Sequence, residues 1–293
     1  MTPPDAPHNR WSDLDRPPLN AAALRRGLLK PGGLWTSLDI VESTGSTNSD
    51  LAARAAGSAG GTVLVGGTVL VAEEQTAGRG RLDRSWTAPP RSGLFLSVYL
   101  TPGDVPAERW GWLPLLAGVA AATGLAQSAG VDMALKWPND LLVTVDGTER
   151  KTGGILAERA GDGVVIGMGI NVSLRAAELP APHAGSLGLA GAVSTDRETL
   201  LRAVLRSLEE WYGRWREADG DAAASGLRTA YAAGCATLDR TVRAELPGDR
   251  SVVGEAVAID GDGRLVLATG GGLQEPVSAG DIVHLRGAGG GLT

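Results

Sequence analysis

A chain of 293 residues, 43% of them hydrophobic, is long enough to bury a substantial core in one large domain with a small one beside it. Its net charge of −6 argues against nucleic-acid binding driven by bulk electrostatics. The single cysteine, Cys235, excludes an internal disulfide, and the three histidines lack zinc-ligand spacing. The N-terminus has no apolar core of a signal peptide, so this composition predicts a cytoplasmic protein.

Residues 1–34 are predicted to form an N-terminal segment that is partly disordered and contains one short helix. Prolines and polar residues fill the positions up to Pro18, and they offer little to a core. Asn20 is suited to cap a helix that runs to Leu29, before the breaker run at 31–33.

The polar run Ser46-Thr47-Asn48 follows a predicted strand, Leu38–Glu42. Thr47 or Asn48 is predicted to cap a helix over Ser49–Ala56, because such side chains accept hydrogen bonds from the first free N–H groups of a helix. Capping alone accounts for this run. The same helix end also offers free N–H groups and a positive dipole end to an anion, so both interpretations stay open.

The stretch from Glu73 to Trp86 is predicted to be a mobile loop that closes around a carboxylate and a phosphate. It follows an apolar run, Gly67–Ala72, with the β-branched content of a buried strand. The loop carries two glycines and three arginines, Gly78, Arg79, Gly80, Arg81 and Arg84. This composition offers no face to bury, so no regular strand or helix is expected, and guanidinium groups suit anions. The alternative is a solvated basic turn, but Gln75 and Trp86 on either side favour a site.

The segment from Trp110 to Val131 has no charged residue and is long enough to span a bilayer. Pro114, four glycines and a high alanine content make it only weakly hydrophobic. We therefore predict a buried helix within Glu108–Ala129, packed on a sheet, with a strand at Gly93–Leu100 before it. No membrane association is expected.

The run Lys136-Trp137-Pro138-Asn139-Asp140 is predicted to present polar groups at an irregular strand edge, because proline removes a backbone donor. Leu141–Val172 then reads as a three-stranded antiparallel meander that carries Lys151 and Asn171. Lys151 is either an ordinary hairpin lysine or a ligand contact. The Gly153-Gly154 pair just after it, where a ligand can approach the backbone, favours the second interpretation.

The C-terminal third changes from helices to short strands. Helices are predicted from Asp196, with an apolar face, and over about Asp221–Ala233. Four strands follow, Thr241–Leu246, Val252–Ile259, Arg264–Ala268 and Asp281–Arg286, which together predict a small β-barrel. The tail over 287–293 is expected to be disordered.

Common nucleotide motifs are absent. The chain has no GxxxxGK[ST] phosphate loop and no GxSxG elbow, and Asp83 stands where a dinucleotide fingerprint needs its third glycine. Five blocks in order nevertheless form a distinctive set. They are Ser46-Thr47-Asn48, EQTxGRGR at 74–81 with Trp86 after it, KWPND at 136–140, KxGGIL at 151–156 and GxGINV at 167–172. In this set the chain resembles biotin protein ligases, over about Leu38 to Arg286.

This resemblance implies an α+β fold. The expected architecture is a mixed, largely antiparallel β-sheet backed by helices, a class II synthetase-like catalytic domain over 35–236, with a small SH3-like barrel over 237–286. The implied activity has two steps. Biotin and ATP, with Mg²⁺ carried by the nucleotide and no dedicated protein metal site, give biotinyl-5′-AMP. The biotinyl group then passes to a lysine of a biotin carboxyl carrier domain of acetyl-CoA/acyl-CoA or pyruvate carboxylase.

The resemblance also implies roles for residues at the matching positions. The expected biotin contacts are Ser46, Thr47, Asn48, Gln75, Gly78, Arg79, Gly80, Arg81, Lys151 and Gly154. The expected ATP and adenylate contacts are Arg81, Arg84, Trp86, Lys136, Asn139, Asp140 and Asn171. Lys151, Arg79 and Arg81 are the expected catalytic cations, because an anionic carboxylate must attack an anionic phosphate.

Two departures from the family pattern stand out. Leu82-Asp83 follows Arg81, where the family has a basic or polar residue and then glycine, which makes the loop less basic. Only about forty residues precede the site, too few for the winged helix-turn-helix of repressor members, so we expect a monofunctional ligase without specific DNA binding. A lipoate-type ligase of the same fold and a biotin-sensing repressor are the alternatives.

Overall fold

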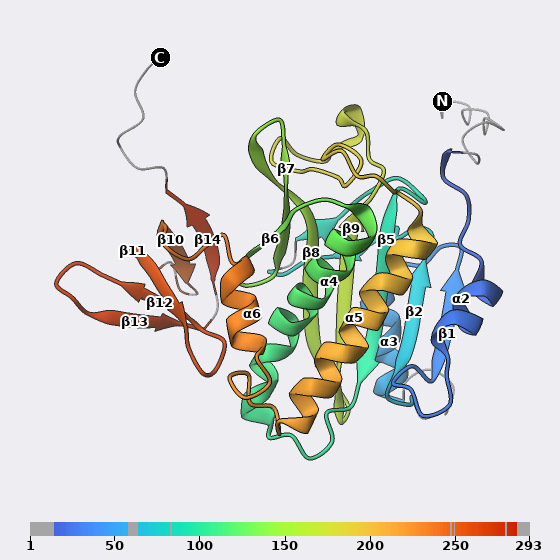
Figure 1. Ribbon diagram of the computed structural model, residues 1–293, viewed down its shortest axis with the longest axis horizontal. Coiled ribbons are helices and arrows are strands. Elements are labelled where there is room, and N and C mark those ends of the chain that lie inside the picture. The colour runs from blue at the N-terminus through green and yellow to red at the C-terminus, as the bar shows by residue number, and fades with distance from the viewer. Residues whose placement is uncertain are drawn as a thin grey trace.

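The computed structural model describes residues 15–57, 64–82, 84–246, 248, 250–278 and 280–285. The predictions of disorder for 1–14 and for the tail at 287–293 fall outside these residues. Figure 1 shows a large sheet with helices against it and a smaller sheet at one end. The helices are α2 (Ala21–Leu28), α3 (Thr47–Ala55), α4 (Leu113–Ala129), α5 (Arg197–Glu217) and α6 (Leu227–Gly234), with short 3-10 helices η1 (Ala107–Trp112) and η2 (Ala176–Glu178).

The large sheet is mixed and largely antiparallel, as predicted. In spatial order its strands are β1 (Ser37–Val41), β2 (Thr68–Ala72), β5 (Gly93–Leu100), β9 (Gly163–Asn171), β8 (Thr148–Ala160), β7 (Asp140–Val145) and β6 (Met133–Lys136). Only the β1–β2 pair is parallel. The predicted meander is the β7–β8–β9 unit, which lies on the β6 side of the sheet.

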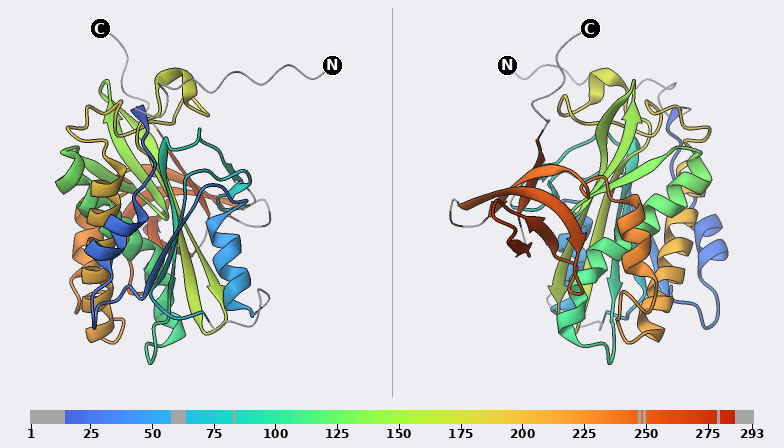
Figure 2. Two further views of the ribbon diagram at one scale, coloured as in Figure 1. Left: turned by 90° about the vertical axis from the view of Figure 1, so that its right-hand side faces the viewer. Right: turned by 60° about the vertical axis from the view of Figure 1, so that its left-hand side comes forward.

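Helices cover the two faces of this sheet unequally. Helices α2, α4, α5 and α6 pack on one face, and α3 packs alone on the other (Figure 2). The main core fills the first interface, and a smaller cluster around Leu51, Leu70 and Tyr99 fills the second. The second face is therefore left open over much of its area, and the site lies there.

Helix α4 is the apolar segment that the sequence marks as long enough for a membrane. The helical stretch Ala107–Ala129 passes that test of length and hydropathy, but 67% of its most apolar window is buried inside the molecule. Gly124 explains the close packing, because a Cβ there would lie 2.8 Å from the backbone of Ala203 in α5. The composition of α4 is thus that of a core helix, as predicted.

Two helix starts differ from the sequence prediction. The cap of α3 is Ser46 rather than Thr47 or Asn48, and its side chain accepts a hydrogen bond from Ser49 N. Helix α6 begins at Leu227 rather than at Asp221, because Gly226 adopts φ +76 and interrupts the helical path. In both cases the sequence contains more than one acceptable cap, so local preference does not decide the boundary.

The arginine loop contains regular structure that was not expected from the sequence. Two short strands, β3 (Gly78–Arg79) and β4 (Ser85–Trp86), pair with each other. Gly78 makes this pairing possible, because a Cβ there would lie 2.4 Å from the carbonyl oxygen of Trp86. Leu82, at the tip, is 63% exposed with φ +54, a conformation that glycine adopts more easily.

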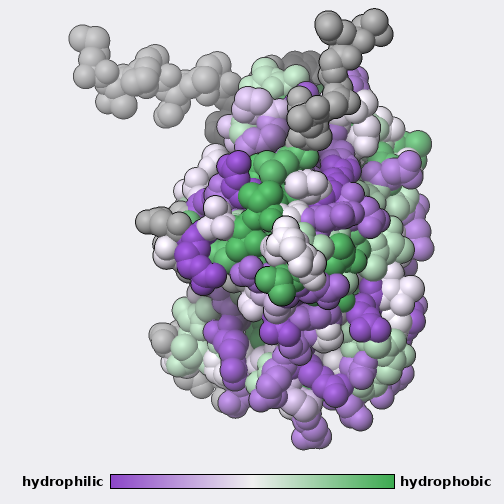
Figure 3. Space-filling model, turned by 90° about the vertical axis from the view of Figure 1, so that its left-hand side faces the viewer, coloured by the Kyte–Doolittle hydropathy of each residue, from purple (hydrophilic) through white to green (hydrophobic). Residues whose placement is uncertain are grey.

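The C-terminal sheet is antiparallel, with strands in the order β13 (Gln274–Val277), β12 (Leu265–Ala268), β11 (Arg250–Ile259), β10 (Thr241–Leu246) and β14 (Asp281–His284). Strand β13 was not predicted, because three glycines precede it and Pro276 lies within it. Strands β13 and β14 end the sheet, so the closed SH3-like barrel stays a prediction. Figure 3 shows apolar side chains among polar ones on this side of the molecule. Val253 in β11 and Val283 in β14 are exposed.

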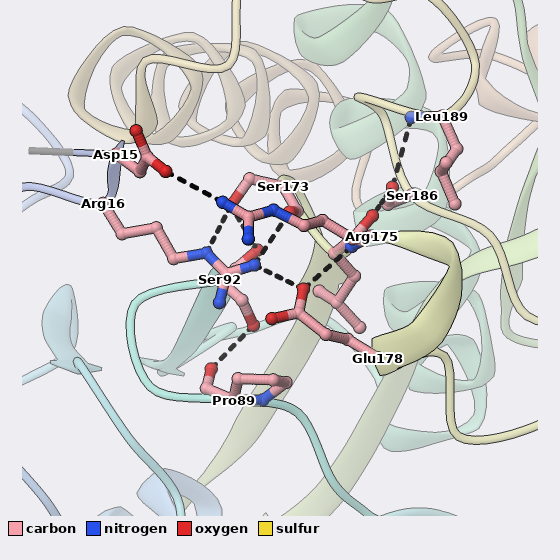
Figure 4. Close-up of polar contacts among 10 residues, drawn as sticks. Asp15, Arg16, Pro89, Ser92, Ser173, Arg175, Glu178, Ser186 and Leu189 are labelled. Carbon is pink, nitrogen blue, oxygen red and sulfur yellow. Dashed lines mark hydrogen bonds and ion pairs between the residues drawn. The ribbon is translucent and has the colours of Figure 1, made fainter. Parts of the chain in front are cut away.

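The described part of the N-terminal segment is tied to the rest of the chain near β9 and the start of α5. Arg16 donates hydrogen bonds to Ser173 and to Glu178 (Figure 4). A buried ion pair, Arg197 to Glu73 at 2.6 Å, continues this junction. Arg197 also donates to the carbonyl of Pro17. Residues 15–18 are therefore held in place, whereas the sequence predicts loose order there.

Candidate active site

A cavity of about 700 Å³ lies where the arginine loop, the open face of the large sheet and strand β14 meet. This volume is typical of small-molecule sites. It is lined by every predicted site residue except Gly78, namely Ser46, Thr47, Asn48, Gln75, Arg79, Gly80, Arg81, Arg84, Trp86, Lys136, Asn139, Asp140, Lys151, Gly154 and Asn171. The fold thus brings together residues from five separate sequence blocks.

The floor of the cavity is made of glycines on two neighbouring strands. Gly154 in β8 pairs with Gly169 in β9, and Gly167 lies two residues before Gly169. The indole of Trp86 covers Gly169, where a Cβ would lie only 2.7 Å from the ring. The Asn48 amide covers Gly167 in the same way, at 2.1 Å. Without these glycines neither side chain could lie flat on the sheet.

A β-bulge aims Lys151 into the cavity. Residues at odd separations normally point to opposite faces of a strand, so Lys151 and Gly154 should diverge. The β7–β8 register shifts between Leu141 and Leu142, which leaves Thr152 as the extra residue. As a result Lys151 Nζ lies 3.6 Å from the Cβ position of Gly154. The sequence shows the glycine pair but not this bulge.

The end of the cavity at α3 is a hydrogen-bonded polar network. Gln75 Oε1 accepts from the backbone N–H of Thr47 at 2.9 Å. The Ser97 hydroxyl, fully buried in β5, contacts Thr47 Oγ1 at 2.7 Å and Asn48 Oδ1 at 2.6 Å. Ser97 was not predicted, because it stands alone in an apolar strand and gives no signal in the sequence.

The three loop arginines differ in their partners. Arg79 forms an ion pair with Glu158, and Arg84 forms one with Asp281 of β14. Arg81 instead donates to the neutral oxygen Oδ1 of Asn139 at 3.1 Å. Burial is the largest cause that lowers the Arg81 pKa from its ordinary value. Arg81 is therefore a partly desolvated cation with a neutral hydrogen-bond partner, and the charges of Asp281 and Asp140 only partly offset the effect of burial on its pKa.

Two lysines face one carboxylate at the other end of the cavity. Lys151 Nζ lies 2.6 Å from Asp140 Oδ1. Lys136 Nζ makes no ion pair or hydrogen bond with the described residues. Burial lowers the Lys136 pKa, while the charge of Asp140 acts in the opposite direction. Lys136 and Arg81 are thus the cations most available to an anionic ligand.

Strand β14 and the β7–β8 hairpin complete the wall with residues that sequence reasoning missed. Glu149 accepts two hydrogen bonds from Arg240, at 2.6 and 2.7 Å. Arg240 also contacts His284 Nδ1 at 3.2 Å, and His284 Nε2 lies 3.2 Å from Thr237 Oγ1. Since arginine only donates, Nδ1 accepts and Nε2 carries the proton. Burial, then the nearby positive charges of Lys136 and Arg240, lower the His284 pKa to about 4.

Two buried polar atoms at the cavity lack partners among the described residues, Asn171 Oδ1 and Trp86 Nε1. Asn171 is 2% exposed, and its amide nitrogen already donates to the Gly185 carbonyl at 3.0 Å. A buried acceptor and a buried donor without partners cost free energy, which a polar ligand can recover. This supports the predicted placement of both residues in a binding site.

Asp140 in the cavity would help to hold an Mg²⁺ ion that a nucleotide carries. The described residues contain no group of three or more His, Cys, Asp or Glu side chains arranged to hold a metal. Asp140 lines the cavity and belongs to an ion pair with Lys151. Mg²⁺ is commonly held by one or two carboxylates together with substrate phosphates, which fits this donor set.

Comparisons with known proteins agree with this geometry. Residues 54–173 match the Biotin/lipoate A/B protein ligase family, and residues 237–285 match the Biotin protein ligase C terminal domain. A Biotin--[acetyl-CoA-carboxylase] ligase of Mycobacterium tuberculosis is 46% identical over 274 residues, which cover 92% of this chain and 97% of that protein. The chain belongs to the biotin protein ligase family.

Further relatives resemble this ligase in sequence or in fold. A Bifunctional ligase/repressor BirA of Bacillus subtilis is 34% identical over 249 residues, 82% of this chain and 71% of that protein. The solved biotin protein ligase of Aquifex aeolicus, in complex with biotin and ATP, superposes with a TM-score of 0.68 at 26% identity. That match covers 86% of this ligase and all of the Aquifex chain. The predicted family, a mixed sheet backed by helices, and an additional C-terminal sheet are confirmed.

Proposed function

We propose that this ligase activates biotin with ATP as biotinyl-5′-AMP and transfers the biotinyl group to a lysine of a biotin carboxyl carrier domain. The observation that carries this proposal is the single cavity into which all five sequence blocks converge. It has a neutral polar network at one end and the cations Arg81, Lys136 and Lys151 at the other. A ligand with a polar, uncharged ring and a carboxylate to be joined to a phosphate matches this polarity.

The chemistry requires cations rather than a general base. In the first step a carboxylate oxygen bonds to the α-phosphorus of ATP, the P–O bond to the β-phosphate breaks, and pyrophosphate leaves. The carboxylate is already ionised, so the barrier is the approach of two anions. Groups that bind more strongly as negative charge gathers on the phosphate lower that barrier. Mg²⁺ bound with ATP would neutralise part of the phosphate charge.

The roles of individual residues follow from their positions. Thr47, Asn48 and Gln75 would bind the uncharged end of biotin, beside Ser46. Lys151, aimed inward by the bulge, would contact both the biotin carboxylate and the α-phosphate. Arg81 would hold the adenylate linkage. The biotin side is completed by Arg79, Gly80 and Gly154, and the nucleotide side by Arg84, Trp86, Lys136, Asn139, Asp140 and Asn171.

The second step needs an acceptor amine from outside the chain. A neutral lysine amine attacks the acyl carbon, the bond to AMP breaks, and the amine loses a proton. The name of the Mycobacterium relative points to acetyl-CoA carboxylase as the source of the carrier domain. We propose a carrier of that type, a cytoplasmic location, a catalytic domain over 35–236 and a C-terminal domain over 237–286 that closes the nucleotide end.

Pyrophosphate release is the direct test. The purified protein with MgATP should release pyrophosphate with biotin and not with lipoate, and a carrier domain should gain one biotinyl group by mass. Release with lipoate alone would assign the chain to the lipoate branch of the matched family. Tight, sequence-specific DNA binding in a gel-shift assay at low salt would instead favour the repressor alternative.

A further inference from the structure

Glu158 stands beside the cavity without lining it. It lies in β8 on the same face as Gly154 and Leu156, which do line the cavity, because residues two apart on a strand share a face. Its side chain is 28% exposed. Any influence of Glu158 on a bound ligand must therefore pass through its neighbours.

The first neighbour is the arginine loop. Arg79 donates from Nη2 to Glu158 Oε1 at 2.9 Å and from Nη1 to Oε2 at 3.1 Å. Such two-bond pairing fixes the plane of the guanidinium group as well as its position. Because Arg79 belongs to β3, this contact anchors the base of the loop against the sheet.

The second neighbour is the Asn48 amide, which is 4% exposed. Asn48 Nδ2 donates to Glu158 Oε2 at 2.9 Å and to the Leu156 carbonyl at 3.1 Å. Both amide hydrogens are therefore used, and a flipped amide would place Oδ1 against two acceptors. The carboxylate thus fixes which atom of Asn48 faces Ser97.

This orientation sets the direction of the next hydrogen bonds. Asn48 Oδ1 can only accept, so Ser97 donates its proton there, and Ser97 Oγ then accepts from Thr47 Oγ1. Thr47 and Ser97 each have one hydroxyl proton, but three contacts between oxygen atoms could use one. The longest contact, from Thr47 Oγ1 to Gln75 Oε1 at 3.1 Å, is therefore left without a proton. Thr47 at the cavity wall therefore presents lone pairs, which suit an N–H group of the ligand.

We propose that Glu158 is a positioning residue for the biotin end of the site, which makes Thr47 a hydrogen-bond acceptor through Asn48 and Ser97 and anchors Arg79. The ligand feature it selects is an N–H donor, as in a cyclic urea. This inference rests on the proposed function. It goes beyond it because Glu158 is not a site residue by motif and does not touch the cavity.

The test compares Glu158→Gln with wild type in biotin-dependent pyrophosphate release. The variant places an amide against the donors of Arg79 and Asn48, so the KM for biotin should rise about 10- to 100-fold. The KM for ATP should change by less than about twofold. Glu275→Gln, which removes the carboxylate of the exposed Arg250 pair in the C-terminal sheet, is the matched control and should match wild type.

Two further measurements separate positioning from general destabilisation. Trypsin should cut after Arg79 faster in Glu158→Gln than in wild type, because the anchor is lost. Glu158→Gln should raise the biotin KM less in an Asn48→Ala background than in wild type, because the part of its effect that passes through Asn48 is already lost there. If Glu158→Gln does not fold, Glu158→Asp, which keeps the charge with a shorter reach, should show the same selective rise to a smaller extent.

A folded variant whose biotin KM stays within about threefold of wild type would overturn the proposal. So would equal increases in the KM values for biotin and ATP, or full additivity with Asn48→Ala. A wild-type protein that releases no pyrophosphate with biotin would instead overturn the proposed function itself. The wild-type measurement comes first and keeps the two failures distinct.

Discussion

Lys151 Nζ lies 2.6 Å from Asp140 Oδ1, across the irregular part of the β7–β8 pairing. Asp140 holds the Lys151 ammonium group over the cavity floor. An anionic ligand that competes for this lysine must share it with Asp140. The pair therefore both positions the cation and restrains its charge until substrate arrives.

Replacing Lys151 by alanine should slow adenylate formation while leaving the fold intact. The expected loss is about 2–4 kcal/mol of transition-state stabilisation, or roughly 30- to 1,000-fold in kcat, the size measured for other charge-stabilising donors. Single-turnover pyrophosphate release is the measurement. Lys30→Ala, at an exposed lysine far from the cavity, should behave as wild type. Near-normal adenylation by Lys151→Ala would remove this residue from the mechanism.

Gly154 and Gly169 should respond differently to alanine although they pair side by side. A Cβ at Gly169 would lie 2.7 Å from the Trp86 ring and force it to move, so Gly169→Ala should lower both stability and activity. A Cβ at Gly154 meets nothing closer than 3.5 Å. Gly154→Ala should therefore keep the wild-type Tm.

The same Gly154→Ala variant should lose biotin affinity, about 10-fold or more, if a ligand needs the space above this glycine. Isothermal titration with biotin and thermal unfolding on the same samples check both statements. Unchanged biotin binding by Gly154→Ala would place the ligand elsewhere in the cavity.

The buried ion pair between Arg197 and Glu73 should be costly to break. Both side chains are at most 7% exposed, and Glu73 also accepts from the backbone N–H of Leu19. Arg197→Met leaves a carboxylate buried without its counter-charge, so the free energy of unfolding should fall by about 3–5 kcal/mol. Urea unfolding monitored by tryptophan fluorescence measures it. The double variant Arg197→Met with Glu73→Gln should recover part of the loss, and a single variant within about 1 kcal/mol of wild type would contradict the prediction.

Folding stability should depend on His284 in mildly acidic solution. Its folded-state pKa is about 4, below the ordinary value of 6.5, so the unfolded chain binds more protons between these pH values. Stability should therefore fall as the pH drops from about 6.5 to about 4. The contribution is at most about 3 kcal/mol, from roughly 1.36 kcal/mol per pKa unit, and partial solvent exposure reduces it.

Comparing the Tm at several pH values in wild type and in His284→Gln separates the effect of His284 on stability from the effect of carboxylates that titrate in the same pH range. Glutamine cannot titrate, so the difference between the two proteins should change across the window. Tm curves that stay parallel across this pH range would show that the His284 pKa is the same in the folded and unfolded states.

Most of the secondary structure could be predicted because the hydrophobic pattern of each element is local in the sequence, whereas the grouping of the site was expected from the resemblance to a family. Short continuous apolar runs mark the buried strands β2, β5 and β9, and helical spacing of apolar residues marks α5, which buries one face. Every site residue expected from the five sequence blocks lines the cavity, with Gly78 as the exception. That glycine serves the β3–β4 pairing instead.

What the sequence by itself determined is therefore most of the strands and helices, the family and the residue types of the site. Only the tertiary structure decided which charges meet. Arg84 pairs with Asp281, 197 residues away, and Arg79 with Glu158, because strand register and the docking of the C-terminal sheet fix those distances. The bulge at Thr152, which turns Lys151 toward Gly154, is likewise a property of the pairing between two strands and not of either strand alone.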